Sequence, residues 1–527
     1  MIDGHENQTD VGRWTRWDGA AVALVLVVAL AVRIPFRSQL AYHWDSAQFA
    51  LALGEYDLRD GQPQPPGFYL YVVLGRLVNL VVGEPHAALV WLSVIAGAWL
   101  VAAGYLLATS MFGRECGWAT GLILLTSPLC WFHSEVALTT IVDSALVTSF
   151  VLLGWRAIRQ RVTWFQTVLL AALLAAVAGV RQQTAPCLIP LGLYVLWRAE
   201  QQRGWKLLCA IALTVSFSLF WFIPTMRSAG GFASYIHLLR LKNQFDAHQT
   251  VWGGGGLKAF WTNIGNLSAA TWVGLLAAAL IFVIEFILWS VFEKPTAKDH
   301  LRRAHRLQFH LLALWIAPMV LFWLLMYVTM PGYALNFFPA VAIFAALGLV
   351  RHSGRLSGLL RVRRGWTHCG VLGFVVAINS IIFVLQPVWA ERLLAGMPLT
   401  GVEIRRHDAD LSACFQAIRR KWAPANVVIC HGVESFYWGF RQFEYHLPEY
   451  RNVLLFSDAS SADDLGRKTW VGYHWKTTFQ SDFGAADGQH ALLAVPPGLS
   501  PDIFGHFFDV RGASLVVESG MTLYELH

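Results

Sequence analysis

The sequence predicts a polytopic α-helical membrane protein that carries a small α/β domain at its C-terminal end. Of its 527 residues, 56% are hydrophobic and only 14% are charged, against about 25% charged in ordinary soluble domains. Uncharged runs recur from Gly19 onward, and runs of about 15 to 25 such residues suffice to cross a bilayer. After residue 388 the composition becomes that of a soluble domain. These observations exclude an ordinary cytosolic enzyme.

Eleven runs are long enough to be predicted as spans. The first begins after a polar segment, residues 1–18, and has no small-residue cleavage site, so we expect a retained anchor rather than a removed signal peptide. Segment 67–82 is predicted to be a helix along the membrane surface, because an additional crossing would break the charge alternation described next. The predicted spans are residues 19–36, 87–110, 117–132, 143–155, 164–180, 184–197, 207–224, 269–291, 308–328, 333–350 and 369–387.

The loops between these runs predict the orientation. Lys and Arg gather in every second loop, for example at Arg114, Arg156 and Arg351, and short cytoplasmic loops carry such an excess. We therefore expect a cytoplasmic N-terminus, an extracytoplasmic C-terminus and a location in a bacterial inner membrane. Segments 37–86, 225–268 and everything after residue 388 then face outward. Orientation also explains most of the net charge of +7, so no nucleic-acid partner is expected.

Residues 388–527 are predicted to form the extracytoplasmic α/β domain, and residues 19–387 the transmembrane domain with its outer loop 37–86. Leu411, Cys414, Phe415 and Ile418 repeat as on one face of a helix, and strand-like runs cover 426–430, 491–495 and 514–526. Cys414 and Cys430 are either disulfide-bonded, which an oxidising compartment would permit, or two buried thiols. The cysteines and histidines lack zinc-ligand spacing, so no metal site is predicted.

Asp45 is the first candidate for chemistry. It follows the first span in the polar and aromatic cluster His43-Trp44-Asp45. A carboxylate there could accept a proton from an acceptor hydroxyl if desolvation raised its basicity. The alternative is structural, because Gln48 stands three residues later and would make Asp45 the N-cap of a helix in a capping box. The local sequence leaves both open.

Glu135 and Asp143 are two further acidic candidates on the predicted outer side. A carboxylate inside a span costs about 2.5 to 3.5 kcal/mol on insertion scales, so it is expected to face a polar cavity or a partner. Either acid could orient a sugar hydroxyl, hold a cation or pair with a base. The alternatives are helix capping for Asp143 and simple solvation for Glu135.

Arg181 is the leading candidate for binding a phosphate. It ends the fifth span on the outer side, where orientation does not require positive charge, and its planar fork suits phosphate oxygens such as those of a lipid-linked sugar. Arg227, Arg240 and Lys242 in the outer segment 225–268 are candidates of the same kind. The alternative for these three is an exposed base beside lipid headgroups.

An ordered set of motifs resembles a known family. The outer-loop acid, Gly54-Glu55-Tyr56-Asp57, and Gln64-Pro65-Pro66-Gly67 leading into Phe68-Tyr69 resemble the GT-C glycosyltransferases of the dolichyl-phosphate-mannose protein mannosyltransferase and aminoarabinose transferase type. Val142-Asp143 and Gly332-Tyr333 follow in matching order. Two departures stand out: Gln64 replaces the Lys of the aminoarabinose enzymes, and Tyr333 replaces a basic residue.

The resemblance implies inverting transfer of one sugar from a polyprenyl-phosphate donor to an acceptor on the outer face of the bilayer. It implies Asp45 as general base, Asp143 as a second acid near the donor, and Arg181 as a base near the donor. No cofactor is implied, and a divalent metal is not required. The alternative is a lipid or sugar transporter or flippase, which the clustering of charges on one side disfavours. The substrate cavity is expected at His43, Trp44, Tyr56, Asp57, Pro65, Pro66, Tyr69 and Tyr333.

Overall fold

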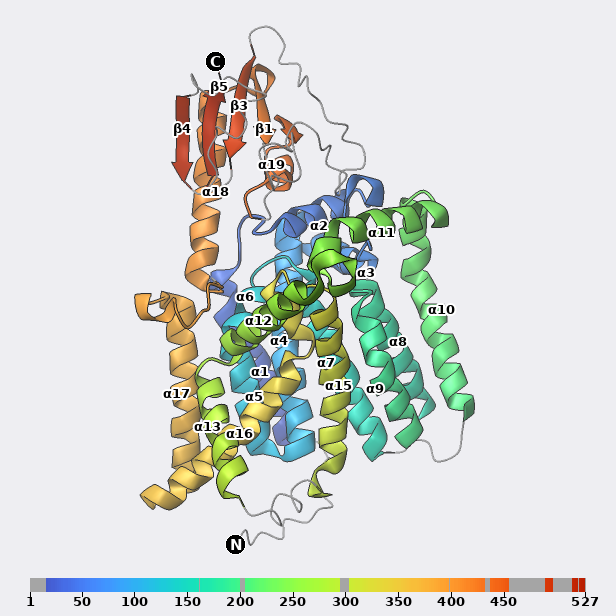
Figure 1. Ribbon diagram of the computed structural model, residues 1–527, viewed down its shortest axis with the longest axis vertical. Helices are drawn as coiled ribbons and strands as arrows, with labels where there is room; N and C mark the ends of the chain where they lie inside the picture. Colours follow the sequence, from blue (N-terminus) through green and yellow to red (C-terminus); the bar gives the residue numbers. More distant parts are fainter. Residues whose placement is uncertain are drawn as a thin grey trace.

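The computed structural model describes residues 16–160, 162–199, 204–293, 303–397, 399–431, 437–454, 489–495, 514–519 and 521–526. Most of the predicted cytoplasmic segment 1–18 therefore lies outside the described residues. The rest forms a bundle of long helices with a smaller sheet-containing region beyond one end, as Figure 1 shows.

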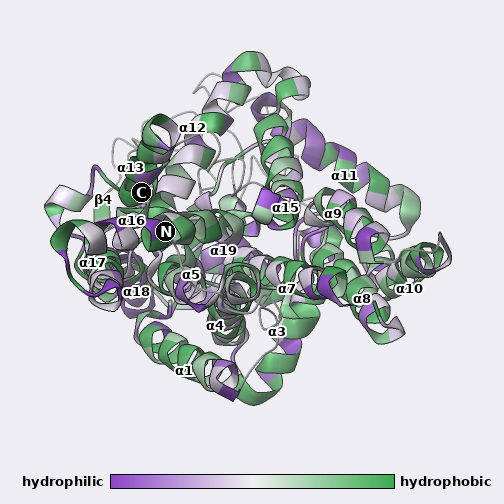
Figure 2. Cartoon of the chain, turned by 90° about the horizontal axis from the view of Figure 1, so that it is seen from below, coloured by the Kyte–Doolittle hydropathy of each residue, from purple (hydrophilic) through white to green (hydrophobic). Residues whose placement is uncertain are grey.

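The bundle consists of helices formed by the apolar segments of the chain. Each predicted span contains at least part of one helix. Its helices are α1 (Arg16–Arg33), α4 (Pro85–Phe112), α5 (Arg114–Thr126), α6 (Pro128–His133), α7 (Thr139–Arg159), α8 (Trp164–Val180), α9 (Thr184–Ala199), α10 (Gly204–Ser228), α12 (Gly256–Leu275), α13 (Ala277–Phe292), α15 (Arg306–Leu325), α16 (Phe338–Leu360) and α17 (Arg364–Leu385). Helices at the rim expose apolar side chains, including Leu24 of α1 and Phe220 of α10. Seen from below, α1 is almost entirely hydrophobic (Figure 2).

Fewer helices than predicted are long and apolar enough to cross a membrane alone. In the part of the chain that the structure describes, six helices meet that standard, and a bent pair would make a seventh. The helix α8 is apolar but shorter. The structure therefore supports a multispanning membrane protein without fixing the number of crossings at eleven.

The bent pair corrects one predicted span. Residues 269–291 were expected to form one straight helix, but α12 and α13 meet at 102°, and Leu276 between them has a left-handed φ of 41°. Asn263 and Asn266 of α12 donate hydrogen bonds to backbone carbonyls of residues 324, 326 and 328, in the last turn of α15 and just after it. These polar contacts hold α12 across the end of the bundle, so only α13 continues along it.

Three further helices cover the same end of the bundle: α2 (Trp44–Gly54), α3 (Tyr69–Val82) and α11 (Phe232–Asp246). They lie beneath the sheet-containing region in Figure 1. The helix α3 packs on α4 and exposes Leu80 and Val81 by more than four-fifths, as expected of a helix at a membrane surface. The helix α11 carries a marked hydrophilic stretch (Figure 2).

The C-terminal region, which we define as residues 401–526, combines two helices with a mixed sheet. Its elements are α18 (Gly401–Lys421), α19 (Phe440–His446), β1 (Val427–His431), β2 (Arg451–Leu454), β3 (His490–Val495), β4 (Ser514–Ser519) and β5 (Met521–Leu526). The described strands are ordered β2-β1-β3-β5-β4, parallel among the first three and antiparallel among the last three. Leu411, Phe415 and Ile418 of α18 are buried against the sheet. Cys414 and Cys430 are free and buried, so the disulfide alternative is wrong.

Backbone and side-chain hydrogen bonds fasten this region to the chain just after α1. The Asp408 carboxylate of α18 accepts hydrogen bonds from the backbone N–H groups of Gln39 and Leu40, at 2.7 and 3.0 Å. The N–H of Ala41 donates to Nε2 of His446 in α19, at 3.0 Å. The segment that leads into α2 is thus held from above by residues some 370 to 400 positions later.

Candidate active site

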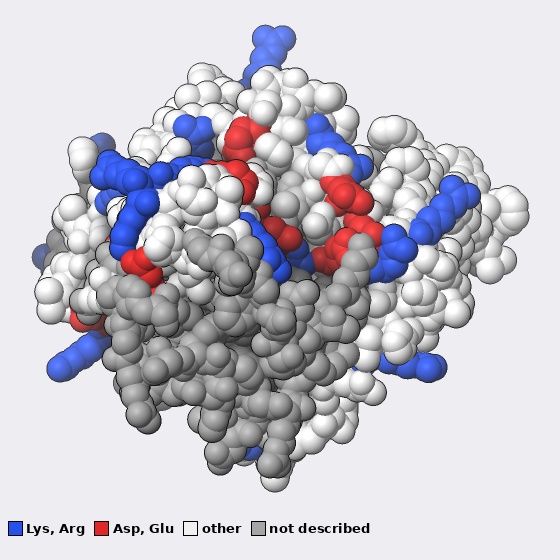
Figure 3. Space-filling model, turned by 90° about the horizontal axis from the view of Figure 1, so that it is seen from above, with Lys and Arg blue, Asp and Glu red and all other residues white. Residues whose placement is uncertain are grey.

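A cavity of about 230 Å³ lies where the helices α2 and α11, the bundle and the C-terminal region meet. Its wall draws on the start of α2, the segment before α3, the start of α7, the turn between α8 and α9, α11, the end of α15 and the turn before α16. From above, Asp and Glu side chains gather near the centre of this face with Lys and Arg beside them (Figure 3). The described polar lining residues include Asp45, Gln64, Thr139, Arg181, Gln183, Lys242, Asp246 and Gln249.

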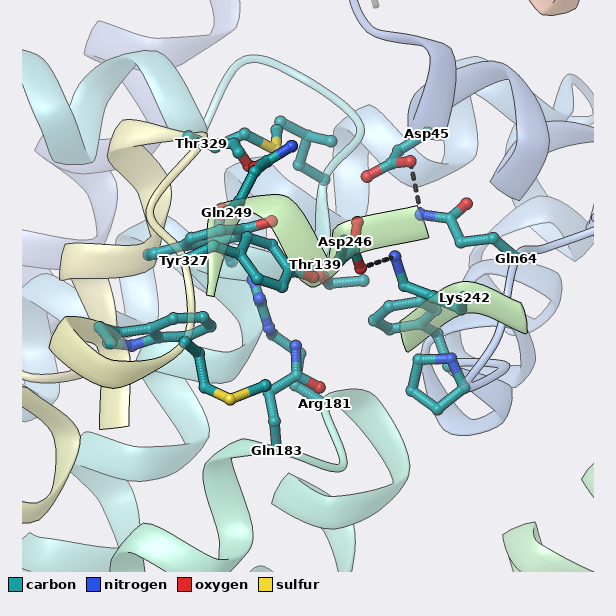
Figure 4. A pocket seen from close by; sticks show the side chains of 18 of the residues that line it. Asp45, Gln64, Thr139, Arg181, Gln183, Lys242, Asp246, Gln249, Tyr327 and Thr329 are labelled. Atoms are coloured by element: carbon teal, nitrogen blue, oxygen red, sulfur yellow. Dashed lines mark hydrogen bonds and ion pairs between the residues drawn. The ribbon is translucent and has the colours of Figure 1, made fainter. Parts of the chain in front are cut away.

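Asp45 lies in this cavity because His43, and not Asp45, caps α2. The N–H of Asp45 donates to Nδ1 of His43 at 3.0 Å, which satisfies one of the open donors of the first turn. The capping interpretation of Asp45 is therefore wrong, and its side chain projects from the helix. Oδ1 accepts a 2.6 Å hydrogen bond from Nε2 of Gln64, which points at Asp45 in Figure 4.

The neighbouring imidazole does not neutralise this carboxylate. Oδ2 of Asp45 is 3.8 Å from Nδ1 of His43, and that nitrogen already accepts a backbone hydrogen bond, so it carries no proton. Burial lowers the pKa of His43, although the charge of Asp45 opposes this. Nδ1 of His43 therefore has no proton to donate to the Asp45 carboxylate.

Arg181 follows α8 directly and reaches the same cavity with 5% of its surface exposed. Its guanidinium lies 4.9 Å from the ring centre of Tyr333, and that ring stacks on Trp323 with centres 4.5 Å apart. An aromatic wall of this kind favours a cation. Nε of Arg181 has no hydrogen-bond partner among the described residues, so part of its donor fork is available to a ligand.

Asp143 is buried close by but does not line the cavity. It is the fifth residue of α7, beyond the cap position, so the capping alternative is wrong. One carboxylate oxygen accepts a 2.9 Å hydrogen bond from the Thr184 hydroxyl. The carboxylate also interacts electrostatically with Arg181. Asp143 thus lies behind the cavity wall near Arg181, and its expected role near a donor stays a prediction.

One face of the helix α11 lines the cavity, and it carries Lys242. Leu239, Lys242, Asn243 and Asp246 line the cavity, and this spacing of three and four residues defines one helix face. Nζ of Lys242 lies 2.9 Å from Oδ2 of Asp246 (Figure 4).

Two basic candidates are excluded from the cavity. Arg240 lies two residues from Lys242, on the opposite side of α11, and is exposed; Arg227 is exposed in the last turn of α10. Neither lines the cavity, so the structure does not bring Arg227 and Arg240 together with Arg181.

Four residues predicted in the cavity instead build the loop that leads to it. Tyr56 donates a 2.8 Å hydrogen bond to the carbonyl of Gly67 and packs edge-on against Tyr69. Asp57 pairs with Arg59 at 2.7 Å. None of Tyr56, Asp57, Pro65 and Tyr69 lines the cavity, which corrects those predictions; the loop they stabilise brings Gln64 and Pro66 to it, and His43, Trp44 and Tyr333 line it as expected.

Glu135 is buried outside the cavity, so neither its catalytic placement nor simple solvation holds. The loop between α6 and α7 folds inward, because the backbone carbonyl of Glu135 accepts a 2.9 Å hydrogen bond from the N–H of Ser38. Burial raises the pKa of the Glu135 carboxyl, and the charges of Arg33 and Arg37 counteract this. Glu135 is therefore a buried carboxyl whose oxygens accept no hydrogen bond among the described residues.

Several lining residues were not predicted. Thr139, Gln249 and Tyr327 carry no local signal, and Tyr437 comes from the C-terminal region. The periodic face of α11 could have identified Asp246 from the sequence. No group of three or more His, Cys, Asp or Glu side chains suited to a metal ion occurs among the described residues, and the expected lack of a cofactor stays a prediction.

The fold and this cavity define a polytopic membrane protein with a polar, aromatic-lined pocket where the bundle meets its C-terminal region. No family model matches the chain, and no curated protein is detectably similar in sequence. Among solved structures, ArnT from Cupriavidus metallidurans bound to undecaprenyl phosphate matches with a TM-score of 0.58 at 15% identity, over 97% of this chain and 98% of that one. The apo state of the same protein gives 0.58 at 14% identity, with the same coverage. The chain therefore shares the fold of ArnT, which confirms the predicted resemblance at the level of the fold.

Proposed function

We propose that the protein is a glycosyltransferase that moves one sugar from a polyprenyl-phosphate donor to an acceptor, with inversion, on the outer face of the membrane. One observation carries the proposal: Asp45 and Arg181, 136 positions apart in sequence, line the same cavity. A general base and a phosphate-binding cation are the two groups this reaction needs. The fold shared with an ArnT structure that binds undecaprenyl phosphate supports the choice of donor.

The donor phosphate is expected at Arg181, with Lys242 as a second cation. Arg181 presents a planar fork held against Tyr333, and a phosphate accepts bidentate hydrogen bonds from such a fork. Lys242 would exchange its contact with Asp246 for the phosphate. Phe322 and Met326 line the cavity beside these groups and suit the first isoprenoid units of the lipid.

In the reaction, the acceptor hydroxyl oxygen attacks the anomeric carbon from the face opposite the phosphate. Its proton passes to the Asp45 carboxylate, the new carbon–oxygen bond forms, and the bond from the anomeric carbon to the phosphate oxygen breaks. The polyprenyl phosphate leaves with the electron pair, and Arg181 stabilises its increased negative charge. Gln64 fixes the orientation of the base through its hydrogen bond to Oδ1 of Asp45. These steps use no metal ion.

The membrane arrangement belongs to the same proposal. Residues 19–387 form the transmembrane catalytic domain with about eleven crossings, the pair α12–α13 contributing one. Residues 388–527 form an extracytoplasmic α/β domain. The N-terminus is cytoplasmic, and the membrane is a bacterial inner membrane. The alternation of basic loops supports this orientation.

The test compares Asp45→Asn with Glu55→Gln, which alters an exposed carboxylate at the end of the same helix. Purified protein is given radiolabelled undecaprenyl-phosphate sugars and a detergent extract of bacterial envelope lipids and glycans. We expect Asp45→Asn to lower transfer by about 100-fold or more, with undecaprenyl phosphate binding retained, and Glu55→Gln to match the wild type. Near wild-type turnover by Asp45→Asn would contradict the base assignment. Movement of the donor across vesicles without transfer would instead support a flippase.

A further inference from the structure

The C-terminal region contributes a side chain to the cavity itself. Tyr437, in the segment before α19, lines the cavity together with His43 and Asp45. Its ring meets the His43 ring edge-on with centres 5.4 Å apart, and the Tyr42 ring with centres 5.6 Å apart. The side chain remains 39% exposed. Tyr437 is thus packed on one side against the residues that precede Asp45 and open on the other.

The position of Tyr437 is fixed by the helix α18 behind it. Nε2 of His407 donates a 2.8 Å hydrogen bond to the Tyr437 carbonyl, and the His407 ring packs between Tyr42 and Trp438, with centres 4.6 and 4.5 Å away. This backbone contact leaves the phenol ring to face the cavity. Across the residues that the structure describes, no hydrogen bond engages the Tyr437 hydroxyl, so a ligand can use it.

Tyr437 lines the same cavity as Asp45 and Tyr333. The pKa of the Tyr437 phenol is raised mainly by burial, and the charges of Glu403 and Asp45 and the nearby Tyr333 hydroxyl contribute. A phenol that keeps its proton donates a hydrogen bond to an oxygen of a bound ligand. The ring contacts above put Tyr437 on the His43 side of Asp45.

The side of Asp45 on which Tyr437 lies decides which substrate it meets. In an inverting transfer, the acceptor approaches the anomeric carbon opposite the phosphate. The phosphate is expected at Arg181, so the acceptor is expected on the side of the base. Tyr437 packs against His43, which caps the helix of that base.

We propose that Tyr437 is an acceptor-binding residue, and that the C-terminal region selects a polyhydroxylated acceptor by stacking and hydrogen bonding at the mouth of the Asp45 site. This inference rests on the proposed function. A phenol ring offers an apolar face to the C–H surface of a sugar ring and a donor to its hydroxyl groups. The region above the bundle thereby becomes part of the binding site for the acceptor, while donor binding stays with the bundle.

The experiment separates acceptor from donor. Tyr437→Phe and Tyr437→Ala are assayed by titrating the envelope extract at saturating radiolabelled donor, and then the donor at saturating extract. Binding of undecaprenyl phosphate alone is measured in parallel. Tyr445→Phe is the matched control, because Tyr445 also joins the C-terminal region to the bundle, by hydrogen bonds with the N–H of His86 at 3.1 Å and with Glu84, but does not line the cavity.

We expect Tyr437→Phe to raise the apparent KM for the extract by about three- to tenfold, as for the loss of one hydrogen bond. Tyr437→Ala should raise it further, with the donor KM and undecaprenyl phosphate Kd within twofold of wild type. If the Tyr437 variants leave the KM for the extract unchanged, or change the Kd for undecaprenyl phosphate by the same factor, the inference is overturned. Sugar transfer by the wild type would still support the proposed function in that case. If Tyr445→Phe has the same effect as Tyr437→Ala, the role is domain attachment and the inference also fails. Absence of transfer by the wild type would contradict the proposed function itself.

Discussion

Replacing Arg181 tests how the cavity would hold a lipid phosphate. A charge-assisted hydrogen bond contributes about 1.5 to 3 kcal/mol, which corresponds to roughly tenfold to 150-fold in affinity. Arg181→Ala should therefore weaken binding of undecaprenyl phosphate by that factor. Arg181→Lys keeps the charge but loses the planar fork and its packing on Tyr333, 4.9 Å away, so a smaller loss of about three- to tenfold is expected.

Two measurements keep the result specific to the phosphate. Binding is determined by calorimetry in detergent for undecaprenyl phosphate and for undecaprenol, which has the same tail and no charge. The Arg181→Ala defect should appear with the first lipid and vanish with the second. Because Asp143 interacts with Arg181, the double variant Arg181→Ala/Asp143→Asn checks that no unpaired buried carboxylate causes the loss. Equal defects with both lipids, or an unchanged Kd for undecaprenyl phosphate, would refute the reasoning.

Two further predictions concern stability. Glu285→Gln should lower the free energy of unfolding by about 3 kcal/mol, because the buried Glu285 carboxylate is 2.9 Å from His352 and 3.3 Å from Arg355 of α16. The control Glu115→Gln removes a half-exposed ion pair and should lower it by less than about 1 kcal/mol; equal shifts of the two variants in a thermal melt would contradict this prediction. Acidification should also destabilise the C-terminal region, because burial lowers the pKa of His407 to about 4 and of His446 to about 3. The unfolded chain then binds more protons as the pH falls from about 6.5 toward 4, so stability falls in that window, by roughly 2 kcal/mol per imidazole at pH 5.

The opposite shift of a nearby carboxyl reduces this acid effect. Burial raises the pKa of Asp408 to about 6, so the folded state gains a proton between pH 6 and about 4, which contributes stability as the pH falls. For these three groups the net loss at pH 5 relative to pH 7.5 is therefore expected to be about 2.5 kcal/mol. Burial also lowers the pKa of His431 in β1 to about 4, which adds roughly 2 kcal/mol. Melting curves of the double variant His407→Gln/His446→Gln should lose the part of this pH dependence that these two imidazoles contribute, and an unchanged dependence would assign the effect to other groups.

The sequence was most informative where a residue conflicts with its surroundings. Asp45 and Arg181 were identifiable because a charge beside an apolar span needs a polar partner or a solvent-filled site, and both line the cavity. Tyr56 and Asp57 looked equally suitable, yet each is satisfied within its own loop. The Asp57 contact with Arg59, two residues away, is a local pairing that the spacing could have revealed.

Other parts of the site depend on tertiary placement that no local pattern encodes. Thr139 is an ordinary first residue of a helix, and Tyr437 lies more than 390 positions after Asp45. The broken helix at Leu276 was likewise hidden, because residues 269–291 are mostly apolar and the hydrogen bonds of Asn263 reach the end of α15, about 60 positions later. Hydropathy reports which residues avoid water, not which backbone carbonyls need a donor.

The attachment of Ala41 to His446 also sets the order in which the protein can be completed. During synthesis, the nascent chain inserts α1 and presents Asp45 long before the ribosome reaches the codons for α18 and α19. Until those codons are translated, the segment before α2 lacks the hydrogen bonds that Asp408 and His446 make with it. A stop codon between residues 388 and 437 would therefore leave the helices of the bundle but remove Tyr437 from the wall of the cavity.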